Sequence, residues 1–105
     1  MRLYLWTTAS PYKDSALETS VVVHELARGL GIRLTGGPAK VDCLARGESA
    51  GLGVGWADFI AGVVGTRGQG DFAMGSWTAG HQSTGIRKYA YSQVCLTGYR
   101  GSVCR

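Results

Sequence analysis

An apolar stripe in residues 56–64 limits the folds open to this chain more than any other part of the sequence. Its members recur at the three- and four-residue spacing that places side chains on one face of an α-helix. They are Trp56, Phe59, Ile60, Val63 and Val64. Such a face needs cover from other parts of the protein, so the sequence predicts a helix whose stripe is buried in the core.

A second helix is predicted to begin near Ser15. Ser15 and Glu18 have the spacing of a capping box, in which each side chain satisfies a free backbone N–H at the helix start. Apolar residues follow at roughly helical spacing as far as Leu30, and Gly29 or Gly31 would end the helix.

Strands are predicted where short apolar runs lie between turn residues. The resulting order is strand, helix, strand, strand, helix, strand. This βαββαβ order predicts an α+β fold of the ferredoxin-like type, an antiparallel sheet with two helices on one face. A small open α/β sheet is the alternative, and 105 residues indicate one domain, 1–105. The predicted strands are 1–8, 32–35, 40–45 and 86–96, with a long loop at 65–85 that holds one short strand around 72–78.

The charge distribution favours an anionic partner. The chain has a net charge of +4, and residues 71–105 hold four Lys/Arg against one Asp/Glu. A basic segment of this kind suits nucleic acid or a protein with an acidic surface. The alternative is a solubilising charge with no partner. The 45% of apolar residues indicates a folded protein, and a glycine-rich chain of this size could complete its core as a homodimer.

The cysteines and the N-terminus predict a cytoplasmic protein. Cys43, Cys95 and Cys104 do not form an even-numbered disulfide framework, so reduced thiols are expected, with a Cys95–Cys104 bridge as the alternative. No targeting segment and no apolar run of membrane-spanning length stand out, so no membrane association is expected.

Alternation in the first and last predicted strands indicates an aromatic and basic sheet face. In the ferredoxin-like order these strands are neighbours, so their matching faces would merge. Aromatic rings stack on bases, and arginines contact phosphates. The alternative is that residues 65–85 cover the rings, with Phe72 and Trp77 as a lid. The expected binding residues are Arg2, Tyr4, Trp6, Arg87, Lys88, Tyr89, Tyr91 and Arg100.

This predicted face resembles that of an RNA recognition motif, a ferredoxin-like domain whose sheet aromatics stack on bases. The letters "LYL" at 3–5 look like the start of its shorter RNP motif. "RKYAY" at 87–91 is similar to the start of the longer one, with Lys88 in place of the glycine and on the last strand instead of the third. The resemblance implies a single-stranded nucleic acid as the partner.

A serine motif gives a third interpretation. "GESAG" at 47–51 matches G-x-S-x-G and resembles the nucleophile elbow of carboxylesterases and lipases. Ser49, Asp71 and His81 follow that family's order of nucleophile, acid and base. However, "GLGVG" is poor helix material where the family's helix begins, and the chain is short for such a sheet.

The remaining polar residues add no further site. His24 is expected at the surface or boundary of the first helix, and the seven acids are scattered. Histidines and cysteines do not recur at metal-ligand spacing, so neither a metal nor another cofactor is expected. The sequence therefore favours a small binding domain over an enzyme, with nucleic acid as its partner. A protein-binding inhibitor or adaptor is the alternative, because Tyr, Trp and Arg also dominate protein interfaces.

Overall fold

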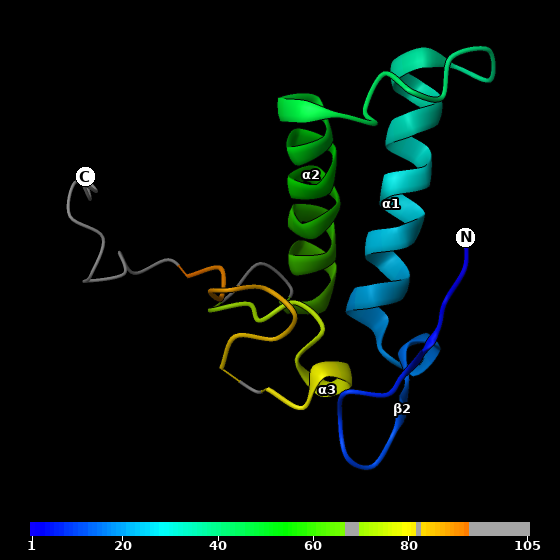
Figure 1. The fold of residues 1–105 in the computed structure, drawn as a ribbon. Coiled ribbons are helices and arrows are strands. Elements are labelled where there is room, and N and C mark those ends of the chain that lie inside the picture. Colours follow the sequence, from blue (N-terminus) through cyan, green and yellow to red (C-terminus); the bar gives the residue numbers. More distant parts are fainter. Residues whose placement is uncertain (67–69, 82, 93–105) are drawn as a thin grey trace.

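The computed structural model describes residues 1–66, 70–81 and 83–92 of the chain. Its frame is a pair of long helices that lie side by side, α1 (Thr19–Gly36) and α2 (Gly47–Thr66) (Figure 1). Residues 37–46 join them at one end, so the two helices run in opposite directions. Among the described residues, no helix is both long and apolar enough to cross a membrane.

Short elements gather at the other end of the helix pair. Strand β1 (Leu5–Trp6) pairs antiparallel with β2 (Lys13–Asp14). The 3₁₀ turn η1 (Ser15–Leu17) leads from β2 into α1, and α3 (Ser76–Ala79) is a single helical turn beside β2 (Figure 1). Phe72 and Tyr91 add one isolated antiparallel bridge.

The contact between α1 and α2 combines small and polar residues. The buried residues of α2 are Ala57, Asp58 and Ala61, and those of α1 are Ser20 and His24. Alanines allow two helices to approach closely. Burying Asp58 and His24 would cost free energy unless each had a polar partner, so this contact must supply one.

The predicted helix at 56–64 is confirmed within α2, but the prediction that its stripe is buried is wrong. Four of the five side chains are about half exposed or more, and the fifth, Ile60, is 38% exposed. The reason is that the buried residues of α2 are Ala57, Asp58 and Ala61 instead, and Asp58 contacts His24 of α1. Periodicity identifies an apolar face but not what covers it. These five residues, Trp56, Phe59, Ile60, Val63 and Val64, form an exposed apolar surface on α2, and Trp56 and Ile60 also border the groove between α2 and α1.

Several predicted strands are absent from the described residues. Residues 32–35 form the last turn of α1, where the hydroxyl of Thr35 donates to the carbonyl of Gly31. The helix ends at Gly36, later than the predicted Gly29 or Gly31, and Gly37 after it takes a positive φ of 64°. Residues 40–45 form a loop, and 72–78 contain only the Phe72 bridge and part of α3.

The coarse α+β class fits these helices and the two-stranded sheet. The ferredoxin-like βαββαβ arrangement is not confirmed, nor is the open α/β alternative. Of the last predicted strand, residues 86–90 are irregular and Tyr91 makes only the bridge to Phe72, while 93–96 lie outside the described residues. The predicted Cys95–Cys104 bridge lies there too, and Cys43 is a free, exposed thiol.

Residues 83–92 are held against residues 72–75. The backbone N–H of Ile86 donates to the carbonyl of Met74 at 2.8 Å, and Met74 is only 1% exposed. Gly85 makes this approach feasible because its φ of 66° is left-handed and a Cβ there would overlap the carbonyl of Met74. This turn places Arg87 and Tyr91 beside α2.

Candidate functional site

Asp58 is the buried carboxylate at which α1, α2 and residues 83–92 meet. Its side chain is completely inaccessible to solvent. The guanidinium of Arg87 donates to both carboxylate oxygens, from Nε to Oδ2 at 2.7 Å and from Nη2 to Oδ1 at 2.9 Å. The phenol of Tyr91 donates to Oδ2 at 2.6 Å. A two-pronged arginine contact of this kind is among the stronger hydrogen-bond arrangements in proteins.

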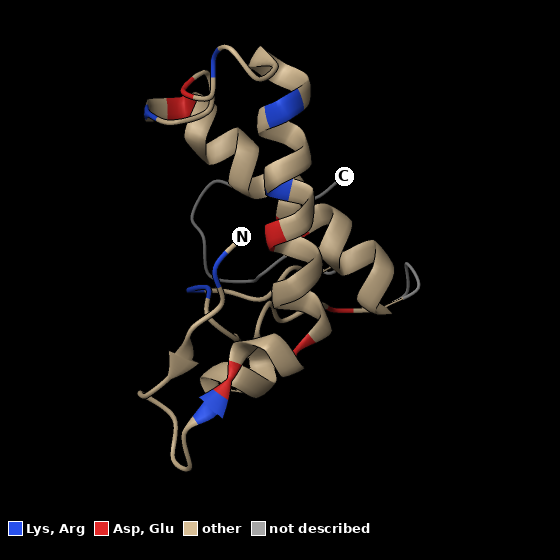
Figure 2. Cartoon of the chain, turned by 90° about the vertical axis from the view of Figure 1, so that its right-hand side faces the viewer, with Lys and Arg blue, Asp and Glu red and all other residues tan. Residues whose placement is uncertain are grey.

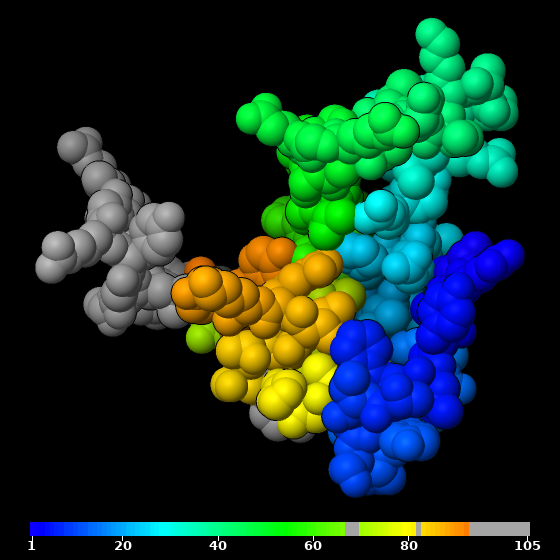
Figure 3. All heavy atoms as spheres, viewed as in Figure 1, coloured from blue at the N-terminus to red at the C-terminus, as the bar shows by residue number. Residues whose placement is uncertain are grey.

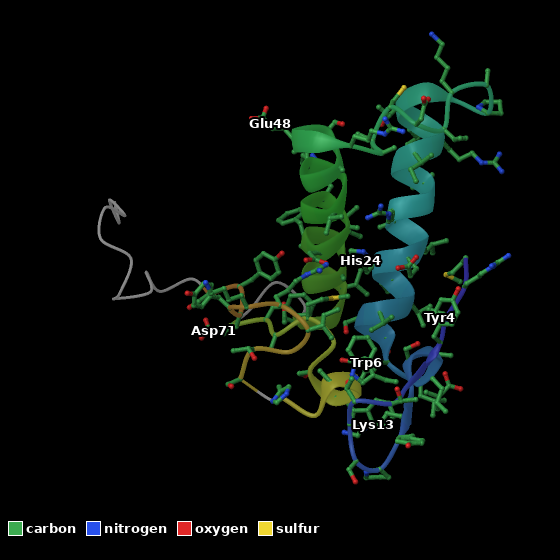
Figure 4. All side chains as sticks on the ribbon, in the orientation of Figure 1. Tyr4, Trp6, Lys13, His24, Glu48 and Asp71 are labelled. Atoms are coloured by element: carbon green, nitrogen blue, oxygen red, sulfur yellow. The ribbon has the colours of Figure 1, made fainter. Side chains whose placement is uncertain are left out.

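His24 of α1 completes this cluster. Its Nδ1 lies 2.6 Å from Oδ1 of Asp58, although the angle is not that of an ordinary hydrogen bond. The His24 side chain is 8% exposed and lies between the two helices in Figure 4. A carboxylate that holds one nitrogen of a histidine ring fixes its orientation and leaves the other nitrogen, Nε2, for a ligand. We call His24, Asp58, Arg87 and Tyr91 the Asp58 cluster.

The protonation states in the Asp58 cluster support one another. Burial alone would raise the pKa of Asp58, but the close contact with His24 and the hydrogen bonds from Arg87 and Tyr91 outweigh burial and hold that pKa well below its ordinary value. The hydrogen bond to Asp58 raises the pKa of Arg87. Burial, and then the bond to Asp58, raise the pKa of the Tyr91 phenol. At neutral pH the cluster therefore holds an ionised Asp58, a charged Arg87 and a protonated Tyr91.

The predicted aromatic and basic face is not assembled. Arg87 and Tyr91 turn toward Asp58, and Phe72 stacks on Tyr91 with ring centres 6.2 Å apart. This stacking matches part of the alternative in which residues 65–85 cover the rings. The other lid residue, Trp77, instead lies under the ammonium group of Lys13.

The other residues expected on that face lie elsewhere. Tyr4 is 68% exposed, and Trp6 is half-buried in β1. Lys88 lies over the ring of Tyr89, Arg2 is exposed, and Arg100 is outside the described residues. Lysines and arginines are spread along the chain among the acids and do not gather on one surface in the view of Figure 2.

The predicted serine triad is not assembled either. Ser49 lies in the first turn of α2, where its hydroxyl donates to the carbonyl of Arg46. Asp71 lies near the opposite end of that helix and accepts a hydrogen bond from Ser92 (Figure 4). His81 is exposed in the loop after α3. Within the described part of the chain, no side chain forms a hydrogen bond with Ser49 that would activate it as a nucleophile.

The sequence reasoning missed both His24 and Asp58. The available signal was the run His24-Glu25-Leu26-Ala27-Arg28. On a helix, H-E-x-x-H presents two zinc-binding histidines one turn apart, with the glutamate as general base. Here the first histidine and the glutamate are present, and Arg28 stands at the position of the second histidine. Asp58 could not be assigned from sequence, because its partners lie 29 to 34 residues away.

A His-Glu pair on a helix, with the histidine held by a buried carboxylate, is typical of metallopeptidases. The chain belongs to the fungalysin metallopeptidase family (M36), whose model matches residues 1–98. It is similar to the extracellular metalloproteinase MEP of Neosartorya fischeri and to that of Aspergillus fumigatus. Each is 46% identical over 101 residues, which cover 92% of this chain and 16% of the relative. Extracellular metalloproteinase 4 of Arthroderma otae is 47% identical over 97 residues, 88% of this chain and 15% of the relative. The chain thus spans about one sixth of these relatives.

These relationships correct the predicted function and location. Membership of a metallopeptidase family contradicts the nucleic-acid-binding domain, its inhibitor or adaptor alternative, and the small serine hydrolase. The predicted cytoplasmic location is wrong because the relatives are named extracellular enzymes. The prediction placed Arg87 and Tyr91 on an open binding face. In sequence, residues that anchor a segment on a buried carboxylate cannot be told from residues of a binding face. An acidic protein partner and a homodimer stay predictions.

The family name implies a bound metal, and the residues at this interface do not fit one. A catalytic zinc takes three protein ligands and keeps one position open. His24 supplies one nitrogen, Arg28 has no acceptor atom, and both oxygens of Asp58 are already bonded. Residues 1–66, 70–81 and 83–92 contain no group of three His, Cys, Asp or Glu side chains arranged to hold a metal ion. We therefore derive no hydrolytic step for this interface.

Proposed function

We propose that this chain is a protease-related segment of a secreted fungalysin-type protein, in which the α1–α2 pair supplies the scaffold of a metallopeptidase site. The observation that carries the proposal is the contact between His24, at the start of a His-Glu run on α1, and the buried Asp58 of α2. Secretion is proposed because the relatives are named extracellular metalloproteinases.

In this proposal the Asp58 cluster is a positioning device. Asp58 fixes the ring of His24, and Arg87 and Tyr91 in turn fix the carboxylate of Asp58. Such outer partners of a histidine govern its orientation and the basicity of its free nitrogen. The cluster also explains why residues 83–92 belong to the scaffold although they form no helix or strand.

The proposal can be tested by placing the chain in a relative. Residues 1–98 would replace the matching segment of the Aspergillus fumigatus enzyme, and the chimera would be expressed in a fungal host. We expect it to be secreted and to unfold in one cooperative thermal transition, because a segment of the same fold can pack against the host's remaining residues.

Two matched chimeras make the result specific. One carries Asp58→Ala, which should reduce secretion because the helix pair loses its buried link to residues 83–92. The other carries a scrambled α1 sequence and should be degraded in the cell. If the chimera with the natural segment is retained and degraded as fully as the scrambled one, the segment is not an equivalent scaffold and the proposal is wrong.

A further inference from the structure

We infer that Arg28 makes the α1–α2 interface a metal-free form of a metallopeptidase site. The inference rests on the proposed function, because the family is what identifies the interface as such a site. The scaffold that orients a histidine is kept, whereas the position one helical turn beyond it holds a fixed cation instead of a ligand.

The position of Arg28 follows from helix geometry. Residues four apart on α1 lie on the same face, with Cβ atoms about 5–6 Å apart. His24 and Arg28 therefore face the same space, as the two histidines of H-E-x-x-H would. Arg28 is half-buried and borders an apolar groove of about 310 Å³ between α1 and α2, together with Gly31, Gly53 and Trp56. The hollow between the two helices is visible in Figure 3.

The chemistry of arginine prevents Arg28 from acting as a metal ligand in place of the second histidine. A guanidinium has five donor N–H groups, no acceptor, and remains charged at every pH a protein tolerates. It therefore cannot ligate a metal, and its charge repels a dication placed at Nε2 of His24. Arg28 thus opposes metal binding twice, because it supplies no ligand atom and because its positive charge repels the ion.

Among the residues that the structure describes, no neighbouring group takes over as a ligand. The carboxylate of Asp58 is occupied by Arg87 and Tyr91. Glu18 accepts from the hydroxyl of Ser20 and from the backbone N–H of Thr78. Glu25 holds the general-base position of the motif, which is not a ligand position.

Zinc titration of the 105-residue chain tests the inference. Zn²⁺ would be titrated by isothermal calorimetry into protein whose cysteines are alkylated with iodoacetamide, so that thiols do not contribute. We expect no binding above background for the natural chain. Arg28→His restores two histidines one turn apart. It should tighten zinc binding by at least about 10- to 100-fold, since losing even an outer partner of a ligand costs that much.

Matched variants assign the effect to this pair of positions. Arg33→His removes the same charge from the same helix, but position 33 is nine residues from His24 and pairs with Gly29 one turn back, so binding should not change. Adding His24→Asn to Arg28→His should abolish the gain. Circular dichroism checks that each variant keeps its helices. If the histidine variant does not fold, Arg28→Glu supplies a carboxylate donor at the same position and should also gain binding.

Two results would overturn the inference. One is zinc binding by the natural chain as tight as that of Arg28→His and lost in His24→Asn. The other is no gain in a folded Arg28→His or Arg28→Glu variant, since Arg28 would then not be what prevents metal binding. Neither depends on secretion of the chimera, so failure here leaves the scaffold proposal standing, and a retained chimera would count against the scaffold alone.

Discussion

Asp58→Ala should lower the free energy of unfolding of this chain by about 3–5 kcal/mol, the usual cost of removing one partner from a buried ion pair. The carboxylate is fully buried and accepts from Arg87 and Tyr91 while contacting His24. Without it, three polar groups lose their partner, and His24 has little access to water. Because small domains are stable by only about 5–15 kcal/mol, this loss should be visible in a urea or thermal unfolding curve.

The matched control is Asp71→Ala. It removes the same charge and a carboxylate hydrogen bond, that to Ser92, but Asp71 is exposed. The change in unfolding free energy should stay within about 0.5 kcal/mol, as is usual for surface substitutions. If the two variants lose the same free energy of unfolding, the Asp58 cluster does not link α1, α2 and residues 83–92 as described.

Gly85→Ala should cost about 3 kcal/mol, the upper part of the usual range for one substitution. Gly85 has a φ of 66°, a left-handed conformation that costs an L-residue about 1–2 kcal/mol. A Cβ would also overlap the carbonyl oxygen of Met74, which accepts the hydrogen bond from Ile86. The backbone must then move, and residues 83–92 would lose their attachment beside Met74.

Gly70→Ala is the control that separates the cost of a left-handed backbone from the cost of steric overlap. Gly70 has a φ of 82°, but a Cβ there would meet no atom of the described residues within 4 Å. This variant should pay only the conformational cost of about 1–2 kcal/mol. Equal losses in the two variants, measured by chemical denaturation, would show that Gly85 is not packed against Met74 as described.

The sequence predicted helices better than their surroundings. The stripe at 56–64 correctly indicated a helix, because side-chain periodicity is a local property. Which face is covered depends on α1, and local spacing carries no information about it. The sequence predicts a strand at 32–35 because a short apolar run fits the helical and the strand period equally well. In the structure, α1 continues through these residues.

The start of the first helix shows tertiary contacts overriding a local signal. Ser15 and Glu18 have capping-box spacing, yet the hydroxyl of Ser15 donates to the carbonyl of Tyr4. Glu18 accepts from Ser20 and from the backbone of Thr78, about 60 residues away in sequence. The cap at this point is made by Asp14, which accepts from the backbone N–H of Ala16.

Only part of the candidate site could be predicted from the sequence. Arg87 and Tyr91 were selected for a functional role, but on an open face, because alternation was the only available clue to their direction. Asp58 is one of seven acids in the sequence, and nothing local marks it as the partner of His24. The His-Glu run could be read from the sequence, and so could its departure from the metal-binding motif at Arg28, on which the inference of a metal-free site rests.

The most direct test of the Asp58 cluster is a ¹³C NMR titration of the Asp58 carboxyl group, followed in the folded chain as the pH is lowered. We expect a pKa well below the ordinary aspartate value of about 3.9, because the close contact with His24 and the hydrogen bonds from Arg87 and Tyr91 outweigh burial. A depressed folded pKa stabilises the fold above about pH 3.9, and that contribution is lost as the pH falls toward the folded pKa. Stability should therefore decline on acidification, and Asp58→Asn should flatten that decline. An Asp58 that titrates at or above about 3.9 in the folded chain would contradict the cluster on which the fold and the candidate site both rest.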